Sequence, residues 1–129
     1  MNTKHALIID DNRTNVTVLE TLLAKSGVTH TSVLDPRHLA EVLGEITDLD
    51  VVFLDLELPG LSGFTVLETF KAHERFHDVP VVAYTVHLSE LNKAHHAGFH
   101  SFIPKPIDPQ RFPGQLERIL RGEAVWERM

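Results

Sequence analysis

The stretch that decides the fold is Asp50-Val51-Val52-Phe53-Leu54-Asp55. Its four inner residues are all apolar and lack the alternation of a strand with one solvent-exposed face. A continuous apolar run of this length is typical of a central strand in a parallel sheet, where both faces are covered. The sequence therefore predicts a buried strand that ends at the carboxylate of Asp55.

Other apolar runs alternate with helical patterns on both sides of this strand. Further strands are predicted at 6–9, 30–34, 79–84 and 101–103, and residues 59–63 are predicted to form a loop. Asp35-Pro36 and Asp108-Pro109 each pair a capping residue with proline, as helix starts do. Ser89 is a candidate cap for the fourth helix, which would end at Gly98. Five strands alternating with five helices predict a three-layer α/β domain with a parallel sheet.

Composition limits the class of protein. The chain has 129 residues, no cysteine, and 12 basic against 18 acidic residues, a formal charge of −6. We expect one domain over 1–122 and a tail over 123–129. The acidic balance argues against nucleic-acid binding, and no apolar run approaches the ~20 residues of a membrane span. The absence of cysteine fits a cytoplasmic location.

Polar residues follow the carboxyl ends of the predicted strands. Asp10 and Asp11 follow the first, Asp55 ends the third, Thr85 follows the fourth, and Lys105 comes after the fifth. Ligands of open α/β sheets bind at this edge. Clustered carboxylates repel unless a cation joins them, and Mg²⁺ prefers such oxygen ligands. A carboxylate held in this way can attack phosphorus, with the lysine supplying fixed positive charge.

These residues carry a resemblance to response-regulator receiver domains of the single-domain type, over roughly residues 4–121. The matching motifs are Ile8-Ile9-Asp10-Asp11, Leu54-Asp55 with Pro59-Gly60 and Gly63, Ala83-Tyr84-Thr85, and Lys105-Pro106. The resemblance implies a flavodoxin-like (βα)5 fold with strand order 2-1-3-4-5. It also implies a signalling switch in a two-component phosphorelay, rather than an enzyme that acts on other molecules.

The resemblance assigns the metal and the phosphoacceptor. Asp55 would accept a phosphoryl group from a histidine kinase or a histidine phosphotransfer protein. Asp11 would bind Mg²⁺ directly and Asp10 largely through water, while Asp55 and the backbone carbonyl of Glu57 would complete the protein ligands. Mn²⁺ would substitute for Mg²⁺.

The resemblance also assigns the switch. Lys105 would pair with the phosphoryl group, and its bond to Pro106 would be cis. Thr85 would turn inward to hydrogen-bond the phosphoryl oxygens, and Phe102 would follow it as the switch aromatic. Output would pass by protein contact through the fourth helix, fifth strand and fifth helix. The same face is a candidate homodimer surface, and this expectation comes only from the resemblance to the family.

Three positions bear on kinetics. Val86 replaces the small residue that usually follows the threonine, so we expect slower phosphotransfer. Glu57 and His87 flank the mouth of the expected site. A pair between them is a hypothesis for shielding the acyl phosphate from water.

Simpler interpretations exist for single residues. Asp10-Asp11 could be only a helix-capping turn, Lys105 an exposed loop lysine, and Phe102 an ordinary core residue. His73 and His77 have the i, i+4 spacing of zinc ligands, but the sequence shows no third ligand for them. Solvated surface is therefore their expected role.

Three other functions compete with the receiver. A phosphatase of the haloacid-dehalogenase type needs a second acid two residues beyond its nucleophile, where this chain has Asn12 and Arg13. A flavodoxin-like flavin binder needs a phosphate loop rich in Ser, Thr and Gly after the first strand, where this chain has two aspartates. A degenerate receiver that only docks is disfavoured, because all five active-site positions hold competent residues.

Overall fold

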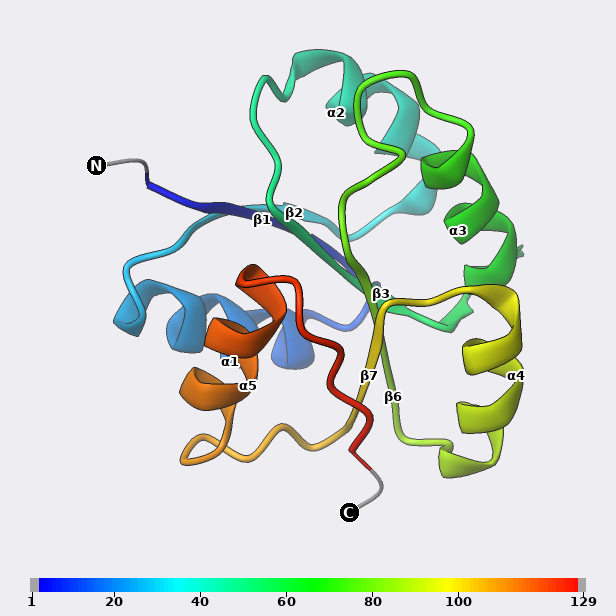
Figure 1. The fold of residues 1–129 in the computed structure, drawn as a ribbon. Helices are drawn as coiled ribbons and strands as arrows, with labels where there is room; N and C mark the ends of the chain where they lie inside the picture. The colour runs from blue at the N-terminus through cyan, green and yellow to red at the C-terminus, as the bar shows by residue number, and fades with distance from the viewer. Residues whose placement is uncertain (1–2, 128–129) are drawn as a thin grey trace.

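The middle layer of the molecule is a parallel sheet of five strands. A computed structural model describes residues 3–127, and its sheet has the order β2-β1-β3-β6-β7 (Figure 1). These strands are β1 (His5–Ile9), β2 (Thr29–Val33), β3 (Val51–Asp55), β6 (Val81–Thr85) and β7 (Ser101–Pro104). When the five strands of this sheet are numbered by their order along the chain, the sheet order is 2-1-3-4-5. The predicted flavodoxin-like fold is therefore confirmed.

Helices cover both faces of this sheet (Figure 1). One face carries α1 (Arg13–Lys25) and α5 (Phe112–Leu120), and the other carries α2 (Leu39–Glu45), α3 (Gly63–Lys71) and α4 (Leu91–Ala97). Short 3₁₀ turns, η1 (Pro36–His38) and η2 (Leu88–Glu90), precede α2 and α4. None of the helices among residues 3–127 is long and apolar enough to cross a membrane.

The predicted central strand is confirmed, and its side chains build both cores. Val52 and Leu54 belong to the core beneath α2, α3 and α4. Val51 and Phe53 belong to the core beneath α1 and α5. Because successive side chains of a strand point to opposite faces, a continuous apolar run supplies both cores at once. All five residues of β3 are buried.

Two of the predicted helix starts differ from the structure. Ser89 lies inside η2 and does not cap α4, whose first residue follows Glu90. Asp108 accepts a hydrogen bond from the Gln110 amide at 2.9 Å, but this closes a separate turn, and α5 begins later, at Phe112. At Asp35 the prediction is confirmed, since its side chain accepts from the Arg37 amide at 3.0 Å.

Two segments that were predicted to be a loop and a tail form backbone pairs of the β type. Within the expected loop, β5 (Leu61–Ser62) pairs antiparallel with β4 (Glu57–Leu58), so this loop is a small hairpin. In the expected tail, Trp126 forms a parallel bridge with Phe102 of β7. The hairpin lies directly after β3 and therefore next to the carboxyl edge of the sheet.

Candidate functional site

Three carboxylates meet at the carboxyl edge of the sheet. Asp10 and Asp11 directly follow β1, and Asp55 is the last residue of β3, which pairs with β1. One oxygen from each of the three lies within 4.8 Å of the others. Asp10 and Asp55 are buried, whereas Asp11 is exposed. The cluster that the sequence predicted is therefore assembled, with one open side.

Asp10 is fully buried, and three donors hold its carboxylate. The Tyr84 hydroxyl donates to Oδ2 at 2.6 Å, Lys105 Nζ reaches the same oxygen at 3.0 Å, and the Asn12 amide donates to Oδ1 at 3.0 Å. Burial by itself raises the pKa of Asp10, but these donors outweigh it, led by Tyr84, so the pKa falls below its ordinary value. Asp10 is thus an anion inside the fold.

Asp55 has fewer donors. Lys105 Nζ lies 3.4 Å from its Oδ2, and the Glu57 amide donates to Oδ1 at 3.0 Å. Burial raises the pKa of Asp55 to about 6, and the neighbouring Asp10 adds to the rise, while the Glu57 amide and Lys105 lower it. As pH falls, Asp55 is therefore protonated before Asp10.

Lys105 is placed between the two buried carboxylates. Its amide donates to the carbonyl of Thr85 at 3.0 Å, which joins the residue after β7 to the end of β6. The Lys105-Pro106 bond is cis, as the resemblance implied. Its ammonium lies 4.3 Å from the centre of the Tyr84 ring, a cation–π contact. The lysine is therefore a largely buried, fixed charge and not an exposed loop residue.

The two expected switch residues lie at the ends of neighbouring strands. Thr85 is buried at the end of β6, and its hydroxyl accepts from the His87 amide at 3.3 Å. Phe102 in β7 is fully buried in the core beneath α3 and α4. Its ring lies 6.3 Å from that of Trp126 and nearly parallel to it. In this structure Phe102 is thus a core residue covered by a second aromatic.

The mouth of the site carries the pair that the sequence suggested. His87 Nε2 contacts a carboxylate oxygen of Glu57, and both side chains are about half exposed. Val86 between Thr85 and His87 is also exposed. The effect of these three side chains on access to Asp55 stays a prediction.

Sequence reasoning missed the role of Tyr84. In the sequence Tyr84 stands only as the middle residue of the motif Ala83-Tyr84-Thr85, yet its hydroxyl makes the shortest bond to Asp10, and its ring faces the ammonium of Lys105. A buried tyrosine hydroxyl generally has a partner. The sequence signal for this role is that Tyr84 directly precedes Thr85, the polar residue that ends β6, and β6 pairs with the strand that ends at Asp55.

The cluster fits a hard divalent cation. The three side chains of the cluster offer carboxylate oxygens, and Asp11 is exposed to solvent beside the buried pair. Few protein ligands with open positions suit Mg²⁺. The histidine alternative finds no support, because His73 stacks on Phe76 and His77 pairs with Asp78 at 3.2 Å. Among residues 3–127, the aspartate cluster is the one group of three or more potential ligands.

Comparison with known proteins agrees with this geometry. The family model described as the response regulator receiver domain matches residues 6–117. A chemotaxis protein CheY homolog from Campylobacter jejuni is 28% identical, over 94% of this chain and 98% of its own length. The sensor histidine kinase AtsR of Burkholderia thailandensis is 30% identical over 89% of this chain but 19% of its own length.

Solved structures agree on the fold. A CheY-like receiver domain from Methylobacillus flagellatus superposes with a TM-score of 0.81 at 24% identity, covering 92% of this chain and 99% of that one. The chemotaxis response regulator CheY4 of Vibrio cholerae superposes with a TM-score of 0.80 at 20% identity, covering 92% and 99%. At these identities the likeness supports the fold alone.

Proposed function

This chain belongs to the response regulator receiver domain family, and from that premise we propose that it is a phosphorylation switch with Asp55 as the phosphoacceptor. The observation that carries the proposal is the place of Lys105. Its ammonium contacts the buried carboxylates of both Asp10 and Asp55, next to the exposed Asp11. Such a site can hold a cation and a phosphoryl group together.

The residues of this chain would share the work of phosphoryl transfer. A carboxylate oxygen of Asp55 forms a bond to phosphorus as the bond from phosphorus to the donor's histidine nitrogen breaks, which leaves an acyl phosphate on Asp55. The Lys105 ammonium pairs with the phosphoryl oxygens, and the Thr85 hydroxyl donates to one of them. Positioning and charge neutralisation supply most of the catalysis in such transfers.

Mg²⁺, or Mn²⁺ in its place, would be held by Asp10, Asp11, Asp55 and the backbone carbonyl of Glu57. When bound, the ion neutralises charge on the transferred group. Asp10 already receives bonds from Tyr84 and Lys105. It would therefore contact the ion largely through water, whereas the exposed Asp11 is free to bind it directly.

The partner upstream would be a histidine kinase or a histidine phosphotransfer protein in the cytoplasm. One relative is named as a sensor histidine kinase and contains a region similar to this chain. Output would pass by protein contact through α4, β7 and α5, without nucleic acid or membrane. Apart from phosphorylation and dephosphorylation of its own Asp55, the chain would catalyse no reaction.

The test is phosphorylation with acetyl phosphate, read by intact mass, in wild type, Asp55→Asn and Asp78→Asn. We expect wild type to gain one phosphoryl group only when Mg²⁺ is present. Asp55→Asn should gain none. Asp78→Asn is the matched control, because Asp78 is exposed and pairs with His77, so it should behave as wild type.

Two outcomes would contradict the proposal. A mass gain that persists in Asp55→Asn would place the acceptor elsewhere. If wild type gains no mass, a histidine phosphodonor protein is tried next. A second failure would favour a receiver that works only by docking.

A further inference from the structure

The segment that follows α5 adds to the open edge of β7. The amide of Phe102 donates to the carbonyl of Val125 at 2.8 Å, and the amide of Glu127 donates to the carbonyl of Phe102 at 3.0 Å. Strand β7 is the last strand of the sheet, so these groups of Phe102 point away from β6. Unpaired groups on such an edge invite another strand. Here the chain's own residues supply it (Figure 1).

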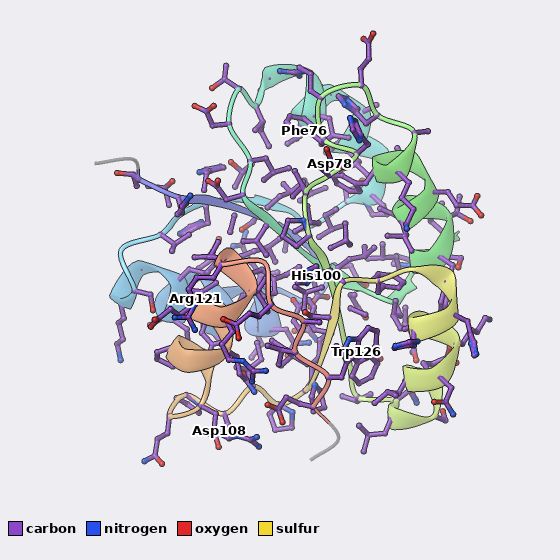
Figure 2. All side chains as sticks on the ribbon, in the orientation of Figure 1. Phe76, Asp78, His100, Asp108, Arg121 and Trp126 are labelled. Carbon is purple, nitrogen blue, oxygen red and sulfur yellow. The ribbon has the colours of Figure 1, made fainter. Side chains whose placement is uncertain are left out.

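Side chains anchor the segment on both sides, as in a strand. Val125 is 1% exposed and lies in the core beneath α1 and α5. Its amide donates to Ser101 Oγ at 2.9 Å. Trp126 stacks on Phe102, and its ring centre lies 4.7 Å from that of His95 in α4. Figure 2 labels Trp126 between the sheet and α4.

Helix α5 completes the contact. Arg111 Nη2 donates to a carboxylate oxygen of Glu127 at 2.7 Å, and Arg118 Nη2 donates to the carbonyl of Ala124 at 3.4 Å. Between these arginines, Gln115 is 7% exposed, and its Oε1 has no partner within residues 3–127. A buried, unpaired carbonyl oxygen costs free energy. The two arginines of α5 hold the segment by an ion pair and by a hydrogen bond to its backbone.

We propose that the outer edge of β7, between α4 and α5, is a strand-docking site whose resident occupant is Val125–Glu127. A partner reaches this face by placing there an extended segment of the same pattern: apolar, aromatic, acidic. Backbone bonds to Phe102, a ring on Phe102 and His95, and a carboxylate on Arg111 would recognise it, as in β-strand addition. The inference rests on the proposed function, because it takes this face to be the one that contacts the output partner.

The resident segment would then regulate access. A tethered segment has a high effective concentration at its own site, so an outside strand competes with it at a disadvantage. A partner must therefore displace Val125–Glu127 before it uses the face.

The first experiment measures amide hydrogen exchange in the 129-residue chain without Mg²⁺ or phosphodonor. In wild type the Phe102 amide should be protected, because its partner is Val125. In Trp126→Ala its exchange should accelerate by about tenfold or more, as expected for local opening. The His100 amide, which donates to Val81 of β6 at 3.0 Å, should not change.

The control is Glu117→Ala, which removes an exposed side chain of α5 that pairs with Arg121 and not with the segment. It should leave the Phe102 amide protected. Fast exchange of this amide in wild type, or unchanged exchange in Trp126→Ala, would overturn the proposal. If Trp126→Ala proves unfolded, Arg111→Ala replaces it, and acrylamide quenching of Trp126, the chain's one tryptophan, should increase.

The second experiment uses a dye-labelled peptide of residues 122–129 and measures fluorescence anisotropy. The peptide should bind Trp126→Ala about tenfold or more tightly than wild type, because the tethered competitor is weakened. A peptide in which alanine replaces the tryptophan should bind neither protein. Equal binding to both proteins, or no binding to Trp126→Ala, would overturn the docking site. Neither experiment needs Asp55 to be phosphorylated, so a failure of the proposed function remains distinguishable.

Discussion

At the scale of single residues, the site depends on an unequal division of donors between two buried carboxylates. Asp10 receives the Tyr84 hydroxyl, the Lys105 ammonium and the Asn12 amide, while Asp55 has Lys105 at a longer distance and the Glu57 amide. The pKa of Asp10 is lowered, and burial raises that of Asp55. Asp55 is thus the carboxylate whose ionisation a bound cation would assist more.

This division predicts how stability depends on pH. The pKa of Asp55 is about 6 in the folded chain against 3.8 ordinarily. Between these values the folded state keeps a proton that the unfolded chain has lost. The free energy of unfolding should therefore fall as pH rises from about 4 to about 6, by at most about 3 kcal/mol.

Urea unfolding of wild type and Asp55→Asn, without Mg²⁺, at pH 4, 5, 6 and 7.5 would measure this effect. The difference between the two proteins isolates Asp55 from other titrating groups. Asp55→Asn should be the more stable protein at pH 7.5. A difference that does not vary with pH would show that Asp55 ionises in the fold without cost.

A second residue-scale prediction concerns Tyr84. Tyr84→Phe keeps the ring over Lys105 but removes a donor at 2.6 Å from a fully buried carboxylate. Hydrogen bonds to charged groups contribute about 1.5–3 kcal/mol, and we expect the free energy of unfolding to fall by about this amount at pH 7.5. Thr21→Val, which removes an exposed hydroxyl, is the control and should change it by less than about 0.5 kcal/mol. Equal effects of the two substitutions would mean that the Tyr84 hydroxyl is unimportant.

At the scale of elements, the close approach of α3 to the end of β3 shapes the loop that carries Glu57. A Cβ on Gly63, the first residue of α3, would lie 2.8 Å from Leu56 Cα and 3.0 Å from the Asp55 carbonyl oxygen. Both neighbours are backbone atoms, which cannot rotate away. Gly63 is therefore required where the strand, the hairpin and the helix meet.

Gly63→Ala should lower the free energy of unfolding by about 1–3 kcal/mol, in the range for overpacking. It should also weaken Mg²⁺ binding, because the loop after Asp55 must move. Gly114→Ala in α5 is the matched control, since nothing lies within 4 Å of its added Cβ, and it should raise stability by about 0.5–1 kcal/mol. Urea unfolding and calorimetric Mg²⁺ titration of both variants measure these effects. A Gly63→Ala protein as stable as the control would contradict the close contact.

At the scale of the whole molecule, the cation site exists only when β1 and β3 are paired, because Asp10 and Asp11 follow one strand and Asp55 ends the other. A ligand that binds only the folded state stabilises it, by about 2.7 kcal/mol at a hundredfold excess over Kd. We therefore expect the Tm to rise steadily with Mg²⁺ concentration at pH 7.5.

Asp11→Asn tests this linkage, because it removes the exposed ligand and leaves the buried pair in place. Its Tm should respond much less to Mg²⁺ than that of wild type. Asp78→Asn is the control for the loss of one exposed charge and should respond as wild type does. An undiminished response in Asp11→Asn would place the stabilising ion elsewhere.

The sequence by itself determined the sheet, its central strand and the members of the acidic cluster. Residues 50–55 predict a strand covered on both faces, and polar residues after parallel strands must meet at one edge of the sheet. Gly98, which ends α4 with a φ of 99°, was also predicted. These features are local, because each depends on the pattern of a few consecutive residues.

Only the tertiary structure decided what each side chain contacts. Tyr84 bonds to Asp10 from 74 positions away, and Trp126 covers Phe102 although its segment has no strand pattern. Helix α5 likewise begins at Phe112 and not at the predicted start beside Asp108. Such contacts depend on how elements that are distant in the sequence pack against one another. The helix and strand propensities of nearby residues are too small in free energy to specify them.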